Sequence, residues 1–549
     1  MLSATVSRFW HGLGTLSGAA AAARKFVYRS RVYRAILRSH LPRLSARPPQ
    51  DPWPANPARL MALGRGCYDF AGQQINAVGG LPWFPTAATF HWVEEAHGFS
   101  WLRDLAAADA PDEARELVSD WIAHCGAWHP VSWRPDVLGR RLTSWLSHAD
   151  FLLRGADMGF ERWFIGSLGA QATHLSRSID EGPAGAERLA AAVGLLYSGL
   201  YLSEGERRLN KAVDILDQAV AEQILGDGSH IERSPSIHLD VLCLLIVARD
   251  ALKNAAERAP SGLPGAIERM SRILLTYRHG DGRLALFNDS CEENVALIET
   301  ALRLADAGDW PAANSTNIGF QSLAAGDTLV IMDAGMPPPA SVSYRTHAGS
   351  LSFELSDGDN RVIVNCGGRG GPSSDWVTAL RATAAHSTVS VGNTDSVGFA
   401  DDGSVCRPPA GVTCNRHDEN GNIWIESSHD GYQEDFETVH ERRLFLTANG
   451  AELRGEDNLV GPADHPFAAR FHLHPGVDAA IDDVGVTLRL KSGSRWKFRV
   501  VGGVLSLAEN VYMGRVGSGA ASHQIVVRGT TSHNKTTIKW ALTRESTEG

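Results

Sequence analysis

The spacing of apolar residues predicts that the first half of the chain is helical. In the clearest segment, residues 206–225, five apolar side chains recur at steps of three or four and form one stripe along a helix: Leu209, Val213, Leu216, Val220 and Ile224. Similar stripes occupy residues 113–125, 137–153, 160–179, 189–202, 239–252, 267–279 and 294–305. Helices joined by short breaks indicate a stack of antiparallel helical hairpins, either a solenoid or a closed toroid.

After residue 311 the helical period is replaced by alternation. Apolar and polar residues alternate through residues 351–355, 389–391, 423–425, 488–490 and 496–500, and Gly-containing turn sequences separate many of these segments. Many short strands without intervening helices predict stacked antiparallel sheets. We therefore predict an α+β multidomain chain. Its predicted parts are a basic N-terminal segment at 1–50, a helical (α/α) toroid at 51–314 and an antiparallel β-sandwich at 315–549.

The basic residues are unevenly distributed. Residues 1–50 contain nine Lys or Arg and no acid, whereas the remainder holds 43 basic and 62 acidic residues, a formal charge of −19. Because phosphate contacts need a broad basic face, this acidic body argues against a nucleic-acid partner. The N-terminal segment does not resemble a cleavable signal peptide. It predicts either an amphipathic helix on an anionic membrane surface or a terminal helix packed on the body. The apolar positions of this helix are Phe26, Val27, Val32, Ile36 and Leu37.

Composition limits the protein class. The 549 residues are 43% hydrophobic and 21% charged, which is typical of a well-packed globular chain and not of a disordered one. No apolar run is long enough to predict a membrane-spanning helix. The seven cysteines form no Cys-x-x-Cys pair, so we expect buried free thiols rather than a disulfide framework or a thiolate zinc site.

Three stretches are rich in residues that recognise polar ligands. The first contains Trp128 and Trp133 and precedes Arg140 and Arg141. Indoles stack on flat faces and guanidinium groups pair with carboxylates, so these four residues are candidates for substrate binding. The alternative is that the tryptophans lie in a core and the arginines are solvated.

The second stretch, residues 226–238, concentrates ionisable groups in one interhelical loop. It contains Asp227, His230, Glu232, Arg233, Ser234 and His238. Loops at one end of a scaffold often carry functional sites, which makes this loop a candidate. Helix capping by Asp227 and Ser234 is the alternative.

The third stretch covers the starts and ends of predicted strands. His347 and His386 each begin a strand, and Asn365 ends the strand between them. These side chains could converge at one end of a sheet, where neutral imidazoles could bind a zinc-like ion or act as a base. A structural role for each histidine is the alternative.

Together these segments resemble the heparinase II/III family of polysaccharide lyases. The resemblance is carried by residues 227–235 (DGSHIERSP), 347–353 (HAGSLSF), 364–367 (VNCG) and 381–389, and it covers the chain from about residue 52 onward. It implies a helical toroid followed by stacked antiparallel sheets. It also implies cleavage of uronic-acid polysaccharides by β-elimination, a carbon–oxygen lyase reaction. Elimination requires a group that neutralises the uronate carboxylate, a base for the C5 proton and an acid for the leaving oxygen.

Several positions depart from the family pattern. The family commonly has His-x-His-x-Asp where this chain has Arg345-Thr346-His347-Ala348-Gly349. The aspartate that helps to hold a metal in relatives is Asn365 here, and the family's tyrosine falls at Ile237 beside His238. The resemblance implies a divalent metal, zinc or calcium, held by His347, Asn365 and His386. A neutral amide is a poor zinc ligand, so we expect no tightly bound cofactor, and a structural metal stays open.

Two main functional hypotheses follow from the sequence. In the first, a lyase acts on an acidic polysaccharide or oligosaccharide: Arg345 neutralises the uronate, His347 or His238 removes the proton, and the other histidine or Tyr197 supplies the acid. Glu232 is a further catalytic candidate, and Arg233 is expected to bind substrate. In the second, a catalytically divergent protein of the same fold binds carbohydrate without cleaving it.

Two points stay open at this stage. Glycoside hydrolysis would need a second carboxylate opposite Glu232, and the sequence does not identify one. The family's substrates imply the periplasm or cell envelope, and the cytoplasm is the alternative because the chain lacks a clear signal peptide.

Overall fold

The structure is a computed structural model that describes residues 15–39, 41–77, 80–308, 319–369, 374–517 and 519–545. The chain forms two compact units that interleave along the sequence. The helical unit comprises Met1–Ile224, Asp240–Glu268 and Glu299–Ala307; the sheet unit comprises Leu225–Leu239, Arg269–Ile298 and Gly308–Gly549. Two stretches from the helical half of the sequence therefore belong to the sheet unit. The boundary expected at residue 314 lies outside the described residues.

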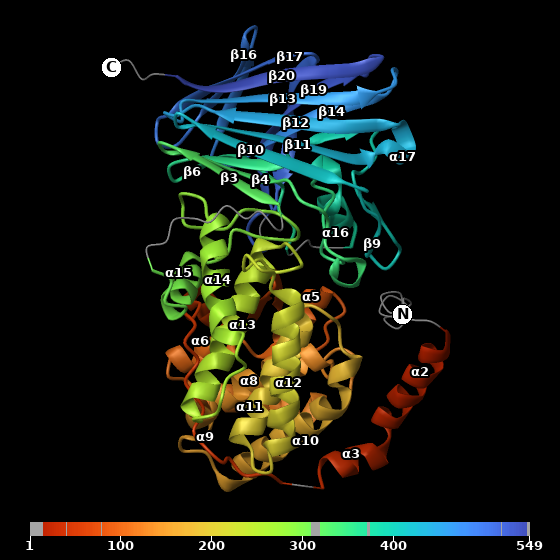
Figure 1. Ribbon diagram of the computed structural model, residues 1–549. Coiled ribbons are helices and arrows are strands. Elements are labelled where there is room, and N and C mark those ends of the chain that lie inside the picture. Colours follow the sequence, from red (N-terminus) through yellow and green to blue (C-terminus); the bar gives the residue numbers. More distant parts are fainter. Residues whose placement is uncertain are drawn as a thin grey trace. The chain divides into compact units, whose positions relative to one another are not determined.

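Each predicted apolar stripe coincides with helical structure, the stripe at residues 137–153 contains two helices, and further helices precede residue 113 (Figure 1). Those that lie wholly in the helical unit are α2 (Thr15–Arg29), α3 (Arg31–Leu37), α4 (Pro57–Leu63), α5 (Phe90–Gly98), α6 (Leu102–Ala107), α7 (Pro111–Cys125), α8 (Pro135–Ser147), α9 (Ala149–Leu153), α10 (Met158–Ser178), α11 (Ala186–Tyr201) and α12 (Glu206–Gln223). Three more helices have residues in both units: α13 (Pro235–Asn254), α14 (Leu263–Thr276) and α15 (Val295–Leu304). The helical unit also contains a hairpin of β1 (Cys67–Phe70) and β2 (Gln73–Asn76).

Local chemistry explains one helix boundary and one close packing contact. Asp157 caps α10 by accepting hydrogen bonds from the backbone N–H groups of Gly159 and Phe160. Helices α8 and α11 approach so closely that a Cβ on Gly139 would lie 2.2 Å from the carbonyl oxygen of Ala190. A larger side chain at position 139 would therefore separate the two helices.

The sheet unit contains two large antiparallel sheets. The first has the strand order β10-β11-β12-β13-β20-β17-β16-β15, and the second has the order β18-β19-β14-β6-β5-β4-β3, with β7 also paired to β14. The bounds of the first sheet are β10 (Val412–Glu419), β11 (Asn422–Tyr432), β12 (Thr438–Leu446), β13 (Glu452–Gly461), β15 (Asp478–Asp482), β16 (Gly485–Arg489), β17 (Arg495–Val501) and β20 (Asn534–Glu545). Those of the second are β3 (Phe320–Ala325), β4 (Thr328–Asp333), β5 (Phe353–Asp357), β6 (Asn360–Val364), β7 (Val389–Val391), β14 (Pro466–Leu473), β18 (Val504–Tyr512) and β19 (Ala520–Thr530).

The two sheets share one apolar core, as a β-sandwich requires. The core contains Leu444 and Trp540 from the first sheet and Phe353 and Phe471 from the second, all nearly inaccessible to solvent. The segments predicted as alternating strands also supply core residues, among them Phe353, Leu488 and Trp496. Shorter elements complete the unit: the hairpin of β8 (Gly398–Phe399) and β9 (Val405–Arg407), and the helices α16 (Ser374–Arg381) and α17 (Gln433–Phe436).

One ion pair is enclosed by this core. The carboxylate of Asp457 accepts hydrogen bonds from Arg442 (2.6 and 3.1 Å) and from the indole N–H of Trp540 (2.9 Å), and it lies 2.9 Å from Nε2 of His440. Burial raises the pKa of Asp457, but Arg442 and His440 outweigh burial and hold this pKa well below its usual value. The side chains of Arg442 and Asp457 are fully inaccessible to solvent.

The N-terminal helices combine a packed face with an exposed one. In the helical unit, the Tyr33 hydroxyl lies 2.8 Å from Nδ1 of His174, and the Tyr28 hydroxyl donates to Glu181. Of the five apolar residues considered for a membrane-facing surface, Leu37 is buried, whereas Phe26, Val27, Val32 and Ile36 are 46–79% exposed. Membrane contact through this surface stays a prediction. Among the described helices, none is long and apolar enough to cross a membrane.

Candidate functional site

Three segments that are far apart in the sequence meet within the sheet unit. They are residues 225–234 before α13, residues 287–291 before α15 and residues 344–349 after β4. Nη1 of Arg345 donates to Oε2 of Glu232 at 3.2 Å, and its Nε lies 3.8 Å from Oδ2 of Asp289. The guanidinium group also donates to the Tyr344 hydroxyl and lies 4.5 Å from the centre of that ring. We call Glu232, Asp289, Tyr344 and Arg345 the Arg345 cluster.

The loop that carries Glu232 is fixed by its local sequence. Gly228 has φ of +97°, and a Cβ at this position would lie 2.4 Å from the backbone of Arg269, so only glycine fits. The Asp227 side chain accepts a hydrogen bond from the backbone N–H of Ser229, which closes the turn. Ser234 precedes α13, and its hydroxyl lies 2.9 Å from that of Ser290 in the second segment. These contacts hold the Glu232 carboxylate, which is fully buried, in place.

The second segment contains two consecutive non-glycine residues in the left-handed region, Asn288 (φ 49°) and Asp289 (φ 56°). Such a conformation is costly and persists where surrounding contacts enforce it. Here the Asn288 amide donates to the carbonyl of Arg233 at 2.9 Å, and its oxygen accepts from the backbone N–H of His347 at 3.0 Å. Asn288 therefore connects all three segments.

His347 and His386 form a hydrogen-bonded pair with defined protonation. Nε2 of His347 accepts from the backbone N–H of Asp289 at 3.0 Å, so the proton of the neutral ring is on Nδ1. This Nδ1 lies 3.1 Å from Nε2 of His386, whose own Nδ1 donates to the carbonyl of Ala382 at 2.9 Å. Burial lowers the pKa of His386 to about 4 and that of His347 well below its usual value. Both rings are therefore neutral near pH 7, and all four ring nitrogens have protein partners.

The residues expected to hold a metal do not fit one. A histidine ligand must offer a free lone pair, but Nε2 of His347 and Nε2 of His386 each accept a hydrogen bond. The oxygen of Asn365 accepts from the backbone N–H of Ser387 at 3.0 Å, and a neutral amide is in any case a poor zinc ligand. In the described parts of the chain, no group of three or more His, Cys, Asp or Glu side chains could hold a metal ion.

His238 lies apart from this pair. Its Nε2 is 2.8 Å from the carbonyl oxygen of Met270, its ring packs edge-on against Tyr277, and it is 1% exposed. Nδ1 has no hydrogen-bond partner among the described residues. Burial lowers the pKa of His238 to about 4. The described contacts do not join His238 to His347, which a shared acid–base role would require.

Arg233 forms a buried ion pair. It donates to Asp333 at the end of β4, and its guanidinium lies 5.0 Å from the centre of the Phe320 ring. It is only 5% exposed, so binding of substrate would require this pair to open. Its role in substrate binding stays a prediction.

The remaining candidates belong to the helical unit. Trp133 is buried and donates to the carbonyl of Cys125, and Arg141 is fully buried, with hydrogen bonds to Gln171, His97 and Ser132. Burial lowers the pKa of Arg141 to about 9. These contacts give both residues a structural role in this unit.

Three other residues of the helical unit complete the set. Trp128 and Arg140 are half-buried, and the Trp128 ring is covered by Tyr28 and Arg29 of α2, at 5.9 and 5.5 Å. Stacking of a sugar on Trp128 would therefore compete with α2. Tyr197 is 2% exposed, and burial raises its pKa far above the usual value, so its proton is held tightly.

Sequence reasoning did not find Asn288, Asp289 or Tyr344. A signal for the first two is present: Asn288 and Asp289 adjoin a serine, and Asn and Asp tolerate the left-handed region better than other non-glycine residues. No signal marks Tyr344 as a partner of Arg345, since neighbouring residues often point in different directions. The phenol of Tyr344 is half-buried and is a proton-transfer group of the Arg345 cluster.

Comparison with known proteins identifies the family. The model of the heparinase II/III N-terminus matches residues 105–307, and that of the heparinase II/III-like C-terminal domain matches residues 307–541. A curated relative, FtsZ-localized protein C of Caulobacter vibrioides (strain NA1000 / CB15N), is 32% identical over an alignment of 545 positions that covers 92% of each chain.

Solved structures show the same fold. The crystal structure of heparinase III matches with a TM-score of 0.75 and 16% identity, covering 96% of this chain and 89% of that one. The heparan sulfate lyase HepC from Pedobacter heparinus matches with a TM-score of 0.60 and 17% identity, covering 98% and 92%. The predicted architecture, a helical toroid followed by a β-sandwich, is confirmed. The chain belongs to the heparinase II/III family.

Proposed function

We propose that this chain binds an acidic polysaccharide but no longer cleaves it by β-elimination. The family and the fold support a polysaccharide as the ligand class. The observation that carries the proposal is that the groups available for elimination are already engaged. Arg345 contacts the carboxylates of Glu232 and Asp289, and every ring nitrogen of His347 and His386 has a hydrogen-bond partner in the protein.

Using Arg345 to neutralise a uronate would be costly. The substrate carboxylate would enter a site that already contains two carboxylates, and Arg345 would have to leave Glu232, which is fully buried. Removing one partner of a buried ion pair costs about 3–5 kcal/mol. His347 would likewise have to release the backbone N–H of Asp289 before its Nε2 could accept the C5 proton. Ground-state binding does not repay these costs unless the interactions are stronger in the transition state.

The proposal predicts no lyase activity. Purified full-length protein is incubated with polygalacturonate, hyaluronan and heparan sulfate, and the ultraviolet absorbance of the unsaturated uronate product is followed. No absorbance increase is expected, while heparinase III run in parallel on heparan sulfate gives a strong signal. Formation of product that is abolished by His347→Ala in a folded variant would refute the proposal and restore the lyase interpretation, with Tyr344 as the first proton-transfer candidate.

The curated relative adds a cellular context. Because 92% of both chains align at 32% identity with a protein described as FtsZ-localized, we propose that this chain also co-localises with FtsZ. A fluorescent fusion of the full chain, imaged together with labelled FtsZ, is expected to give overlapping signals. A uniform distribution, or export across the inner membrane, would contradict this part of the proposal.

A further inference from the structure

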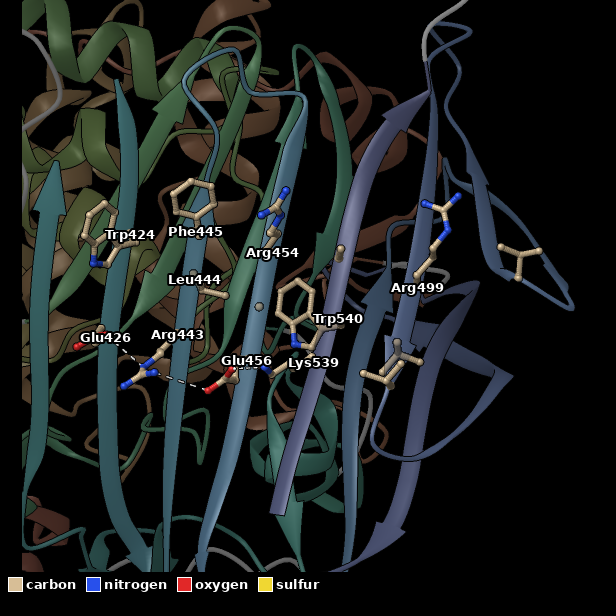
Figure 2. A pocket seen from close by; sticks show the side chains of 15 residues that line it. Trp424, Glu426, Arg443, Leu444, Phe445, Arg454, Glu456, Arg499, Lys539 and Trp540 are labelled. Carbon is tan, nitrogen blue, oxygen red and sulfur yellow. Dashed lines mark ion pairs between the residues drawn. The ribbon is translucent and has the colours of Figure 1, made fainter. Parts of the chain in front are cut away.

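The sheet that contains β10–β13 has an open groove on the face opposite the sandwich core (Figure 2). The groove has a volume of about 650 Å³. Six side chains form one row on this face, because they lie opposite one another in the strand register, and all of them except His417 line the groove. In order along β10, β11, β12, β13, β20 and β17 they are His417, Trp424, Phe445, Arg454, Ala541 and Arg499. We call this set the aromatic row.

The first four residues of the aromatic row contact one another in series. The rings of His417 and Trp424 are stacked with their centres 5.3 Å apart, and the Phe445 ring follows at 6.2 Å from Trp424. The guanidinium of Arg454 lies 5.9 Å from the centre of Phe445. Trp424 and Phe445 are only half-buried, and Figure 2 shows their ring faces turned toward the viewer above the sheet. The row thus offers ring faces at one end and guanidinium groups at the other.

A second row of side chains lies beside the first, and its positive and negative charges pair with one another. Glu426, Arg443, Glu456 and Lys539 alternate in sign, with ion-pair distances of 3.2, 3.7 and 3.4 Å between neighbours. The two arginines of the aromatic row pair with no carboxylate of the groove lining. Among the described residues, Arg454 pairs with Glu452, which lies outside the lining, and no carboxylate pairs with Arg499. The groove lining therefore has a net excess of positive charge, in a chain whose formal net charge is −10.

We propose that the aromatic row binds a segment of an acidic glycan, with sugar rings on Trp424 and Phe445 and carboxylates on Arg454 and Arg499. This inference rests on the proposed function and places the binding surface on the sandwich. Aromatic faces accept the flat apolar face of a sugar, and guanidinium groups accept carboxylates in paired hydrogen bonds. Six strands at roughly 4.8 Å spacing give the row a length of about 24 Å, enough for a short oligosaccharide.

The geometry favours a glycan over an acidic peptide. A peptide commonly gains affinity by adding a strand to a free sheet edge. Here the groove lies over the middle of the sheet, where β11, β12, β13, β20 and β17 each have two neighbouring strands. A ligand on this face therefore contacts side chains and finds no free edge. The ring faces of Trp424 and Phe445, followed by the separated guanidinium groups of Arg454 and Arg499, suit an acidic glycan, whose sugar units are flat and carry carboxylates.

Affinity electrophoresis of the full-length protein tests this inference. Polygalacturonate is the probe in the native gel, with carboxyl-reduced polygalacturonate and poly-L-glutamate in parallel gels. Wild-type protein is expected to be retarded by polygalacturonate and not by carboxyl-reduced polygalacturonate or poly-L-glutamate. Trp424→Ala/Phe445→Ala and Arg454→Ala/Arg499→Ala should each weaken binding by roughly tenfold or more, as expected for anchor residues. A matched control on exposed residues of the helical unit, Trp163→Ala/Arg207→Ala, should bind like wild type.

The outcomes separate the two proposals. Polygalacturonate binding that is unchanged in both groove variants would overturn the groove assignment and leave the proposed function standing. No retardation of wild-type protein by polygalacturonate would overturn the groove assignment. If wild-type protein also failed to bind hyaluronan and heparan sulfate, the proposed function would fail too. Retardation by poly-L-glutamate that is lost in the same variants would identify a peptide-binding face and overturn the glycan assignment. Circular dichroism confirms that each variant is folded.

Discussion

Asp457→Ala is expected to lower the free energy of unfolding of the sheet unit by about 3–5 kcal/mol, the usual cost of breaking a buried ion pair. The substitution removes the carboxylate that pairs with Arg442 and accepts from the Trp540 indole. Arg442 would then be a fully buried cation without its counter-ion, although it would still donate to the carbonyls of Leu351 and Ser387. Urea unfolding followed by tryptophan fluorescence measures the change.

A neighbouring acid provides the control for this variant. Glu456 lies on the same strand but on the outer face, where it pairs with the exposed side chains of Arg443 and Lys539. Glu456→Ala should cost no more than about 1 kcal/mol, because surface ion pairs contribute little. Equal effects of the two substitutions would show that the buried pair is not a major source of stability. The double variant Asp457→Ala/Arg442→Met should recover part of the loss, since it removes the uncompensated charge.

Arg345→Met is expected to cost about 2–4 kcal/mol, because it removes a cation from the fully buried carboxylate of Glu232. Methionine keeps much of the aliphatic side chain, so the loss reports mainly on charge. Glu232→Gln in the same background should restore part of the stability, with a coupling of at least about 1 kcal/mol in a double-mutant cycle. Urea unfolding of the four proteins provides the cycle.

The result for Arg345 bears directly on the proposed function. A group kept for catalysis is commonly held at some expense to stability, so its removal would be neutral or stabilising. The proposal instead makes the Arg345 cluster a structural ion-pair network. Arg489→Met, which removes an exposed arginine paired with the exposed Asp478, is the control and should change stability by less than about 1 kcal/mol. An Arg345→Met variant as stable as this control would contradict the structural role.

Most of the secondary structure follows from local sequence patterns. The stripe at residues 206–225 becomes α12, and the alternation at residues 496–500 places Trp496 and Phe498 in the sandwich core. One predicted helix, residues 137–153, is divided into α8 and α9 at His148. Its apolar stripe continues through the break, so periodicity alone could not detect it. The predictions of α12 and of the strand at residues 496–500 succeed because helical and strand periods come from the backbone geometry of neighbouring residues.

The sequence also identified part of the candidate site. The loop at residues 226–238 and the segments around His347 and His386 were selected because polar residues cluster there, and the structure joins Glu232 to Arg345 and His347 to His386. It does not join His238 to them in any described contact. Residue type and spacing thus locate groups that can do chemistry, but they do not show which hydrogen bonds already occupy those groups.

The sequence by itself determined the class of each element, the family and the acidic character of the body, because these depend on residue type and short-range order. Only the tertiary structure decided that Asp289 contacts Arg345 and that the aromatic row exists. It also decided that every ring nitrogen of His347 and His386 has a hydrogen-bond partner in the protein. That row requires β20 to lie between β13 and β17, an order that does not follow the chain. Contacts between residues tens of positions apart depend on strand order and loop packing, which no local period encodes.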